Sequence, residues 1–178
     1  MVFLCGLAFA AGPPGLWLDV PFVKQETNGC GAASVAMVMQ YWLLKQERAF
    51  GDNADVTTIQ RALYSPQAHG IYASDLERYL RENGFRTFAF RGEWKDFRTH
   101  LQRGRPLVAA LKPVGVGAPL HYVVVVGLDW EQQLVMLNDP AQRKLLKQEW
   151  SSFEREWKAA GNWTLLAVPQ QVATGSLP

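Results

Sequence analysis

The sequence predicts an α+β fold in which a helical N-terminal half packs on an antiparallel sheet from the C-terminal half. Residues 30–46 are apolar on nearly every side, which is typical of a buried central helix. Residues 121–127 and 134–137 are strand-like runs joined by a short polar turn, which predicts an antiparallel hairpin. At 178 residues the chain suits one domain, expected over residues 16–168.

The N-terminal half contains three expected helices. The first covers residues 30–46. The second runs from Asp55, a typical N-cap residue, to Tyr64. The third begins with the capping box Ser74–Glu77 and ends at Asn83–Gly84, where glycine favours termination.

Extended segments and two further helices account for the rest of the expected domain. A helix over residues 94–102 is closed by Gly104, and a short helix begins at Ser151. The expected extended segments or strands cover residues 16–23, 85–90, 106–111, 121–127, 134–137, 144–148 and 162–168.

Two interpretations stay open for the N-terminal residues 1–15. Residues 1–12 are apolar and uncharged, and Ala8-Phe9-Ala10 matches the small-x-small pattern of a signal-peptidase site, but no basic region precedes it. As a shortened secretory signal, the segment implies a periplasmic or extracellular protein that loses Cys5. If the segment is instead a tail, the protein is expected to be cytoplasmic or membrane-associated. A Cys5–Cys30 disulfide is the alternative use of the two cysteines, and residues 169–178 have the composition of a second tail.

Composition and motifs exclude several classes of function. A net charge of +2, from 18 basic and 16 acidic residues, is too small to indicate a nucleic-acid partner. No apolar run of about 20 residues occurs, so no transmembrane helix is expected in the mature chain, although membrane association stays open. Without a phosphate loop, a Cys-x-x-Cys pair or a His-x-x-x-His pair, neither a cofactor nor a metal is expected.

Cys30 is the candidate nucleophile. It lies at the start of an apolar helix, where unpaired backbone N–H groups and the positive end of the helix dipole favour thiolate over thiol. Gln25 precedes it by five residues, behind a flexible Asn-Gly turn. The Gln25 amide and the Cys30 backbone N–H are therefore expected to stabilise an oxyanion that forms beside the sulfur. The alternative is that Cys30 is only a packing residue.

His121 and Asp139 are the candidate base and its orienting carboxylate. His121 opens the first strand of the expected hairpin and Asp139 follows the second, so antiparallel pairing brings them side by side. A nearby carboxylate holds an imidazole in one tautomer, as a base for a thiol nucleophile requires. Asn138 is the alternative orienting residue, and a zinc site made by Cys30, His121 and Asp139 is the alternative use of the cluster.

The residues resemble the peptidase C39 family of papain-like cysteine peptidases. The likeness is carried by residues 20–25, 30–37, 121–126 and 138–140, and it extends over roughly residues 18–168. It implies a papain-like fold and a thiol protease that acts on a peptide or protein. Family members are best known as domains of bacteriocin-exporting ABC transporters that cut leader peptides after a double glycine. The resemblance therefore also implies bacteriocin processing and a separate ABC transporter as partner. Position by position, it gives Cys30 as nucleophile, His121 as general base, Asp139 as orienting carboxylate and Gln25 as oxyanion-hole donor.

Two departures from the family pattern leave alternatives open. The sequence contains neither the membrane domain nor the ATPase of a transporter, and Gly29 stands where the family often has an acidic residue. The alternatives are a papain-like amidase or acyl transferase, and a non-catalytic peptide-binding module. His69 and His100 are expected on the surface, and Trp130, at the hairpin tip, is a candidate for the rim of the cleft.

Overall fold

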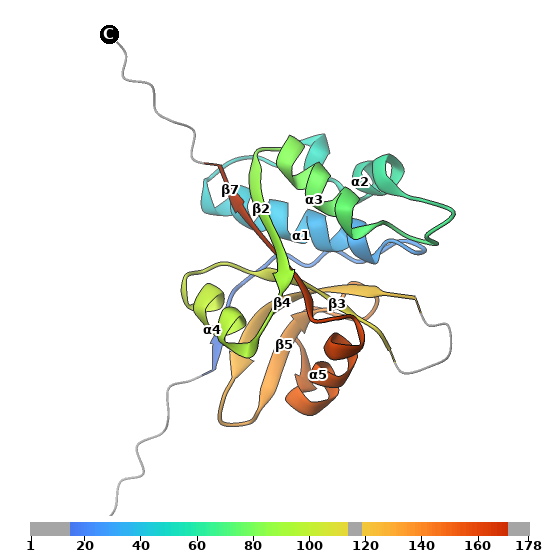
Figure 1. Ribbon diagram of the computed structural model, residues 1–178. Helices are drawn as coiled ribbons and strands as arrows, with labels where there is room; N and C mark the ends of the chain where they lie inside the picture. Colours follow the sequence, from blue (N-terminus) through green and yellow to red (C-terminus); the bar gives the residue numbers. More distant parts are fainter. Residues whose placement is uncertain (1–14, 114–118, 171–178) are drawn as a thin grey trace, which may run out of the picture.

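An antiparallel sheet joins two groups of helices in the computed structural model, which describes residues 15–113 and 119–170 (Figure 1). Within this part of the chain the sheet has seven strands, in the order β2-β7-β3-β4-β5-β6, and β1 pairs with the far end of β4. The strands are β1 (Leu16–Trp17), β2 (Phe85–Arg91), β3 (Leu107–Leu111), β4 (His121–Asp129), β5 (Leu134–Asn138), β6 (Leu146–Glu149) and β7 (Trp163–Pro169).

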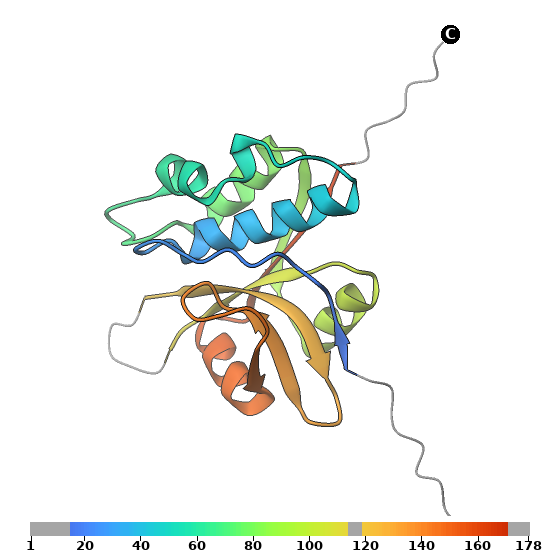
Figure 2. The same ribbon diagram turned by 180° about the vertical axis from the view of Figure 1, so that it is seen from behind.

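Helices cover both faces of the sheet, so β4 is buried on both sides. The helices are α1 (Cys30–Lys45), η1 (Asp52–Ala54), α2 (Val56–Leu63), α3 (Ala73–Glu82), α4 (Trp94–Gln102) and α5 (Trp150–Ala159). Figures 1 and 2 show α1, α2 and α3 together on one side, and α4 and α5 on the other. Val124 and Val126 pack into the core beneath α1, whereas Val123 and Val125 pack into the second core, beneath α4 and α5. This two-sided burial explains the continuous valine run.

The α+β expectation is confirmed, including the buried central helix and the antiparallel hairpin. Helix α1 begins at Cys30, and most of its residues are buried. Asp55 caps α2 as expected, because its carboxylate accepts a hydrogen bond from the Thr58 backbone N–H at 2.9 Å. β4 and β5 form the expected hairpin, with a register shift between Val125 and Gly127.

Two local predictions are wrong. The capping box Ser74–Glu77 does not form, because the N-cap of α3 is Tyr72 and the helix begins at Ala73, which leaves Ser74 inside the first turn. Residues 144–148 do not all pair as a strand, since Leu145 has a left-handed φ of 53° and β6 begins only at Leu146. A capping box that was not predicted forms at the start of α4, between Glu93 and Asp96.

The segments predicted as a signal or as tails lie mostly outside the described residues. They include residues 1–14 with Cys5, and residues 171–178. Among the residues that are described, no helix combines the length and the apolar character needed to cross a membrane.

Candidate active site

The start of α1 places Cys30 at the edge of a cleft. Asn28 has a left-handed φ of 57°, which turns the chain into the helix, and the N-cap residue Gly29 has no side chain to bond the first N–H groups. Cys30 is a free, half-buried cysteine. A Cβ atom at Gly31 would meet three side chains at 3.2–3.4 Å, so a glycine next to Cys30 lets the cleft wall approach closely.

The β4–β5 hairpin brings His121 and Asp139 together, as expected. His121 begins β4 and Asp139 directly follows β5, and the His121 Nε2–H donates to Asp139 Oδ1 at 2.8 Å. The carboxylate is buried and accepts two more hydrogen bonds, from Ala141 N at 2.9 Å and from Gln142 Nε2 at 2.7 Å. Three donors therefore fix the carboxylate and, through it, the plane of the imidazole.

Electrostatic interactions keep this pair ionised. Burial alone would raise the pKa of Asp139, but hydrogen bonding to His121 and its positive charge, aided by Ala141 and Gln142, lower it. Burial alone would lower the pKa of His121, but hydrogen bonds to Asp139 and Cys30, together with their negative charges, raise it to about 9. Because Nε2 is bonded to Asp139, Nδ1 is the ring nitrogen left for Cys30. The arrangement can move a proton between sulfur, imidazole and a substrate atom.

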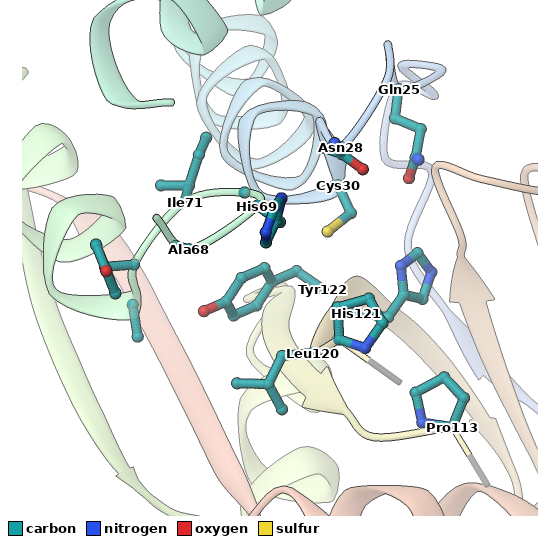
Figure 3. Close-up of a pocket in the computed structure, with 14 residues that line it drawn as sticks. Gln25, Asn28, Cys30, Ala68, His69, Ile71, Pro113, Leu120, His121 and Tyr122 are labelled. Carbon is teal, nitrogen blue, oxygen red and sulfur yellow. The ribbon is translucent and has the colours of Figure 1, made fainter. Parts of the chain in front are cut away.

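Gln25 reaches the same place from the loop before α1. Its backbone N–H donates to the Pro140 carbonyl at 3.0 Å, which ties this loop to the turn that holds Asp139. Figure 3 shows the Gln25 amide pointing to the side of the cleft where Cys30 and His121 lie. The Gln25 Oε1 atom is buried and has no hydrogen-bond partner among the described residues. The amide is therefore free to turn its NH2 group toward a new acceptor.

The cleft beside Cys30 has a volume of about 590 Å³ and mostly apolar walls. One wall comes from the segment that precedes α3, and the other from the residues that lead into β4 (Figure 3). Tyr72 and Leu120 stand on these walls and are 49% and 48% exposed. Among the described residues, those that line the cleft are Gln25, Asn28, Cys30, Ala68, His69, Gly70, Ile71, Tyr72, Ala73, Pro113, Pro119, Leu120, His121 and Tyr122, with no Asp, Glu, Lys or Arg.

Tyr122 lies on the cleft wall directly after His121. Burial and the negative charge of Cys30 raise its pKa to about 12, so its hydroxyl group stays protonated. Its ring packs edge to face on Trp163, and its backbone carbonyl accepts a hydrogen bond from the buried Ser34 hydroxyl at 3.2 Å. These contacts fix the start of β4 against α1, and thereby the position of His121 relative to Cys30.

The structure places three further side chains for which the sequence offered a prediction or an alternative. Asn138 does not orient His121, because its amide donates to Val20 O at 3.1 Å and accepts from Leu145 N at 3.0 Å. Trp130 does not line the cleft but packs edge to face on Trp150. His69 is exposed, as expected, but it lines the cleft, with a left-handed φ of 47° in the turn closed by the Ser65–Gly70 bridge.

Two other findings bear on the site. Gln142 bonds the Asp139 carboxylate and was missed, since only its position in the Asp139-Pro140 turn hinted at it. The described part of the chain contains no group of three or more His, Cys, Asp or Glu side chains arranged to hold a metal ion.

Comparisons with known proteins show the family and the fold. The profile of the Peptidase_C39 like family matches residues 17–165, and a search of curated proteins finds no match. Among solved structures, a putative C39-like peptidase from Bacillus anthracis is 18% identical, with a TM-score of 0.68 over 89% of this chain and 99% of that chain. A double glycine motif protease from an AMS/PCAT transporter, in complex with its leader peptide, is 19% identical, with a TM-score of 0.63 over 89% and 99% of the two chains.

A third solved structure is the peptidase domain of Streptococcus ComA, a bifunctional ABC transporter involved in quorum sensing. It is 18% identical, with a TM-score of 0.63 over 84% of this chain and 98% of that chain. At these identities the likeness shows the fold, which is that of papain-like C39 peptidases.

Proposed function

Because this chain belongs to the Peptidase_C39 like family, we propose that it is a cysteine peptidase that cleaves peptide bonds with Cys30, His121, Asp139 and Gln25. One observation carries the proposal. The imidazole of His121 is hydrogen-bonded to the buried Asp139 carboxylate and lines the same cleft as Cys30, which lies at the start of a helix. A nucleophile and a base in one cleft, with an orienting group bonded to the base, are what covalent acyl transfer requires.

In the first half of the reaction, the Cys30 thiolate attacks the carbonyl carbon of the scissile peptide bond. A C–S bond forms, and the π electrons of the carbonyl move to its oxygen. The Cys30 backbone N–H and the Gln25 amide NH2 donate hydrogen bonds to this oxyanion. When the tetrahedral intermediate collapses, the C–N bond breaks and the His121 imidazolium gives its proton to the leaving amine, which leaves a thioester on Cys30.

In the second half, water hydrolyses the thioester. Neutral His121 takes a proton from the water as its oxygen attacks the thioester carbon, and the same two donors stabilise the second oxyanion. Collapse breaks the C–S bond, releases the carboxylic acid product and restores the Cys30 thiolate beside the His121 imidazolium. Throughout the cycle, the Asp139 carboxylate keeps the Nε2 proton in place, so that Nδ1 exchanges protons with the substrate.

The substrate we propose is a leader peptide cut after a double-glycine motif, with a separate ABC transporter as partner. Two observations support this extension. The double glycine motif protease with a similar fold was solved with its leader peptide. The cleft beside Cys30 has mostly apolar walls, and no Asp, Glu, Lys or Arg lines it among the described residues, which suits an uncharged peptide stretch at the scissile bond.

Cleavage of a double-glycine peptide by the purified protein, followed by mass spectrometry, tests the proposal. The expected result is a single cut after the second glycine, absent in Cys30→Ala and His121→Ala and retained in a matched histidine variant outside the cleft, His100→Gln. Cleavage elsewhere in the peptide would contradict the double-glycine specificity but would still support the peptidase activity. Peptide binding without cleavage would favour a non-catalytic module, and turnover that survives in Cys30→Ala would contradict the proposed nucleophile.

A further inference from the structure

Two arginines converge on a pocket at the opposite end of α1 from Cys30. Arg86 in β2 pairs with Val168 in β7. Arg105 precedes β3 by two residues, and its backbone N–H donates to the His100 carbonyl of α4 at 3.0 Å.

Both side chains line one cavity of about 720 Å³, which we term the Arg86/Arg105 pocket. Among the described residues its other lining residues are Trp42, Val168, Pro169 and Gln170, and none of them is acidic. Figure 2 shows the end of β7 beside the C-terminal part of α1, and these two elements contribute Pro169 and Trp42 to the pocket. Trp42 is 12 residues beyond Cys30 on α1, which corresponds to about 18 Å along the helix. The pocket is therefore separate from the candidate active site.

Trp42 and Arg86 each make a contact beside the pocket, but neither arginine has an acidic partner among the described residues. The Trp42 indole N–H donates to the Ala167 carbonyl at 3.0 Å, and the Arg86 guanidinium lies 5.6 Å from the centre of the Phe88 ring. Within residues 15–113 and 119–170, no salt bridge joins either guanidinium to an acid. Burial lowers the pKa of His100, and the positive charge of Arg105 lowers it further.

We propose that the Arg86/Arg105 pocket binds a phosphate-type oxyanion. Two like charges that face one cavity repel each other, and an anion between them removes that cost. A guanidinium fork binds a carboxylate or phosphate through two parallel hydrogen bonds. One guanidinium can bond both oxygens of a planar carboxylate. A tetrahedral phosphate has further oxygens, which can accept hydrogen bonds from a second guanidinium on its other side. The phosphate group is that of free phosphate or of a lipid headgroup.

Isothermal titration calorimetry of the full chain with sodium phosphate, at constant ionic strength, is the first arm of the test. We expect one saturable site, weakened at least about tenfold in both Arg86→Gln and Arg105→Gln, because each substitution removes one charge-assisted pair. Arg91→Gln is the matched control. Arg91 is on the same strand, has no salt bridge among the described residues, and lies about 17 Å along β2 from Arg86.

Flotation with phosphatidylcholine vesicles, with and without phosphatidic acid, is the second arm. Saturation by free phosphate without vesicle binding supports the proposal with soluble phosphate as the source. Binding to phosphatidic acid that requires Arg86 and Arg105 supports it with the lipid headgroup as the source. The absence of arginine-dependent binding in both arms, or an equal loss in Arg91→Gln, overturns it. Circular dichroism of each variant excludes unfolding as the cause of a loss.

Discussion

The Asp139→Asn substitution separates the charge of this carboxylate from its hydrogen-bond geometry. His121 Nε2 and Ala141 N donate to the same oxygen, Oδ1, at 2.8 and 2.9 Å, and asparagine keeps that oxygen. Oδ2, which accepts from Gln142 Nε2 at 2.7 Å, is replaced by an NH2 group. The Gln142 side chain is exposed and can turn its own oxygen toward that group. The substitution therefore removes the negative charge while the bonds to His121 and Ala141 can persist.

The expected effect is a lower pKa for His121. In the native protein this pKa is raised to about 9, because hydrogen bonds to and charges on Asp139 and Cys30 outweigh the opposing effect of burial. A hydrogen bond to a charged group contributes about 1.5–3 kcal/mol, and one between neutral groups about 0.5–1.5 kcal/mol. Loss of the charge thus costs the imidazolium about 1–1.5 kcal/mol. Since about 1.4 kcal/mol corresponds to one pKa unit, the pKa of His121 should fall by about one unit.

The sign of the pH dependence follows from which form is stabilised. The raised pKa stabilises the imidazolium, so the native ion pair is fully formed below the ordinary histidine pKa of 6.5 and is lost as the pH rises through about 9. In Asp139→Asn this loss moves to lower pH. The alkaline limb of the rate profile, which depends on imidazolium as the proton donor, should move in the same direction.

NMR titration of the His121 ring protons between about pH 5 and 11 measures the shift directly. A Cys30→Ser background removes the coupled titration of the thiol, and Asp139→Asn is compared with Asp139 in that background. Gln142→Ala is the control that removes one hydrogen bond and keeps the charge, so its shift should be smaller. An unchanged midpoint in Asp139→Asn would refute the argument that the carboxylate charge holds the imidazolium.

The remaining predictions concern the oxyanion donor and two structural positions. Gln25→Ala should lower kcat roughly 10²–10³-fold while folding is retained, because one of the two oxyanion donors is lost. Steady-state kinetics measure this change, and an unchanged kcat would contradict the role of Gln25 as an oxyanion donor. Gly31→Ala should lower the free energy of unfolding by about 1–3 kcal/mol in urea titrations, because its Cβ meets the cleft wall at 3.2–3.4 Å. Asn138→Ala should cost about 2–3 kcal/mol by the same assay, because its fully buried side chain bonds Val20 O and Leu145 N; a loss under about 0.5 kcal/mol would contradict that account.

The proximity of His121 and Asp139 could be predicted because the signals are local. They lie 18 residues apart on two strands joined by a short polar turn, so antiparallel pairing alone brings them together. Cys30 was placed in the same way, because the apolar run after it marks a helix start. Each of these predictions needed only the hydrophobic periodicity of one element and the short connection between two elements.

The cleft walls could not be predicted, because they depend on contacts between distant segments. His69 and Tyr72 line the cleft only because the turn closed by Ser65 and Gly70 and the start of α3 pack beside α1. No periodic pattern marks such a turn. The sequence favoured Asp139 over Asn138, but the bond from Asn138 to Val20, in the chain that enters the domain, is a tertiary contact that no local signal predicts.

Alkylation of Cys30 by iodoacetamide between pH 4 and 9, in the native protein and in His121→Ala, tests the central claim most directly. The thiolate is the reactive form, and an ordinary cysteine, with a pKa of about 8.5, is largely protonated below pH 7. We expect rapid modification of Cys30 below pH 7 that is lost in His121→Ala. Slow modification with the pH dependence of an ordinary thiol in both proteins would contradict an activated Cys30–His121 pair.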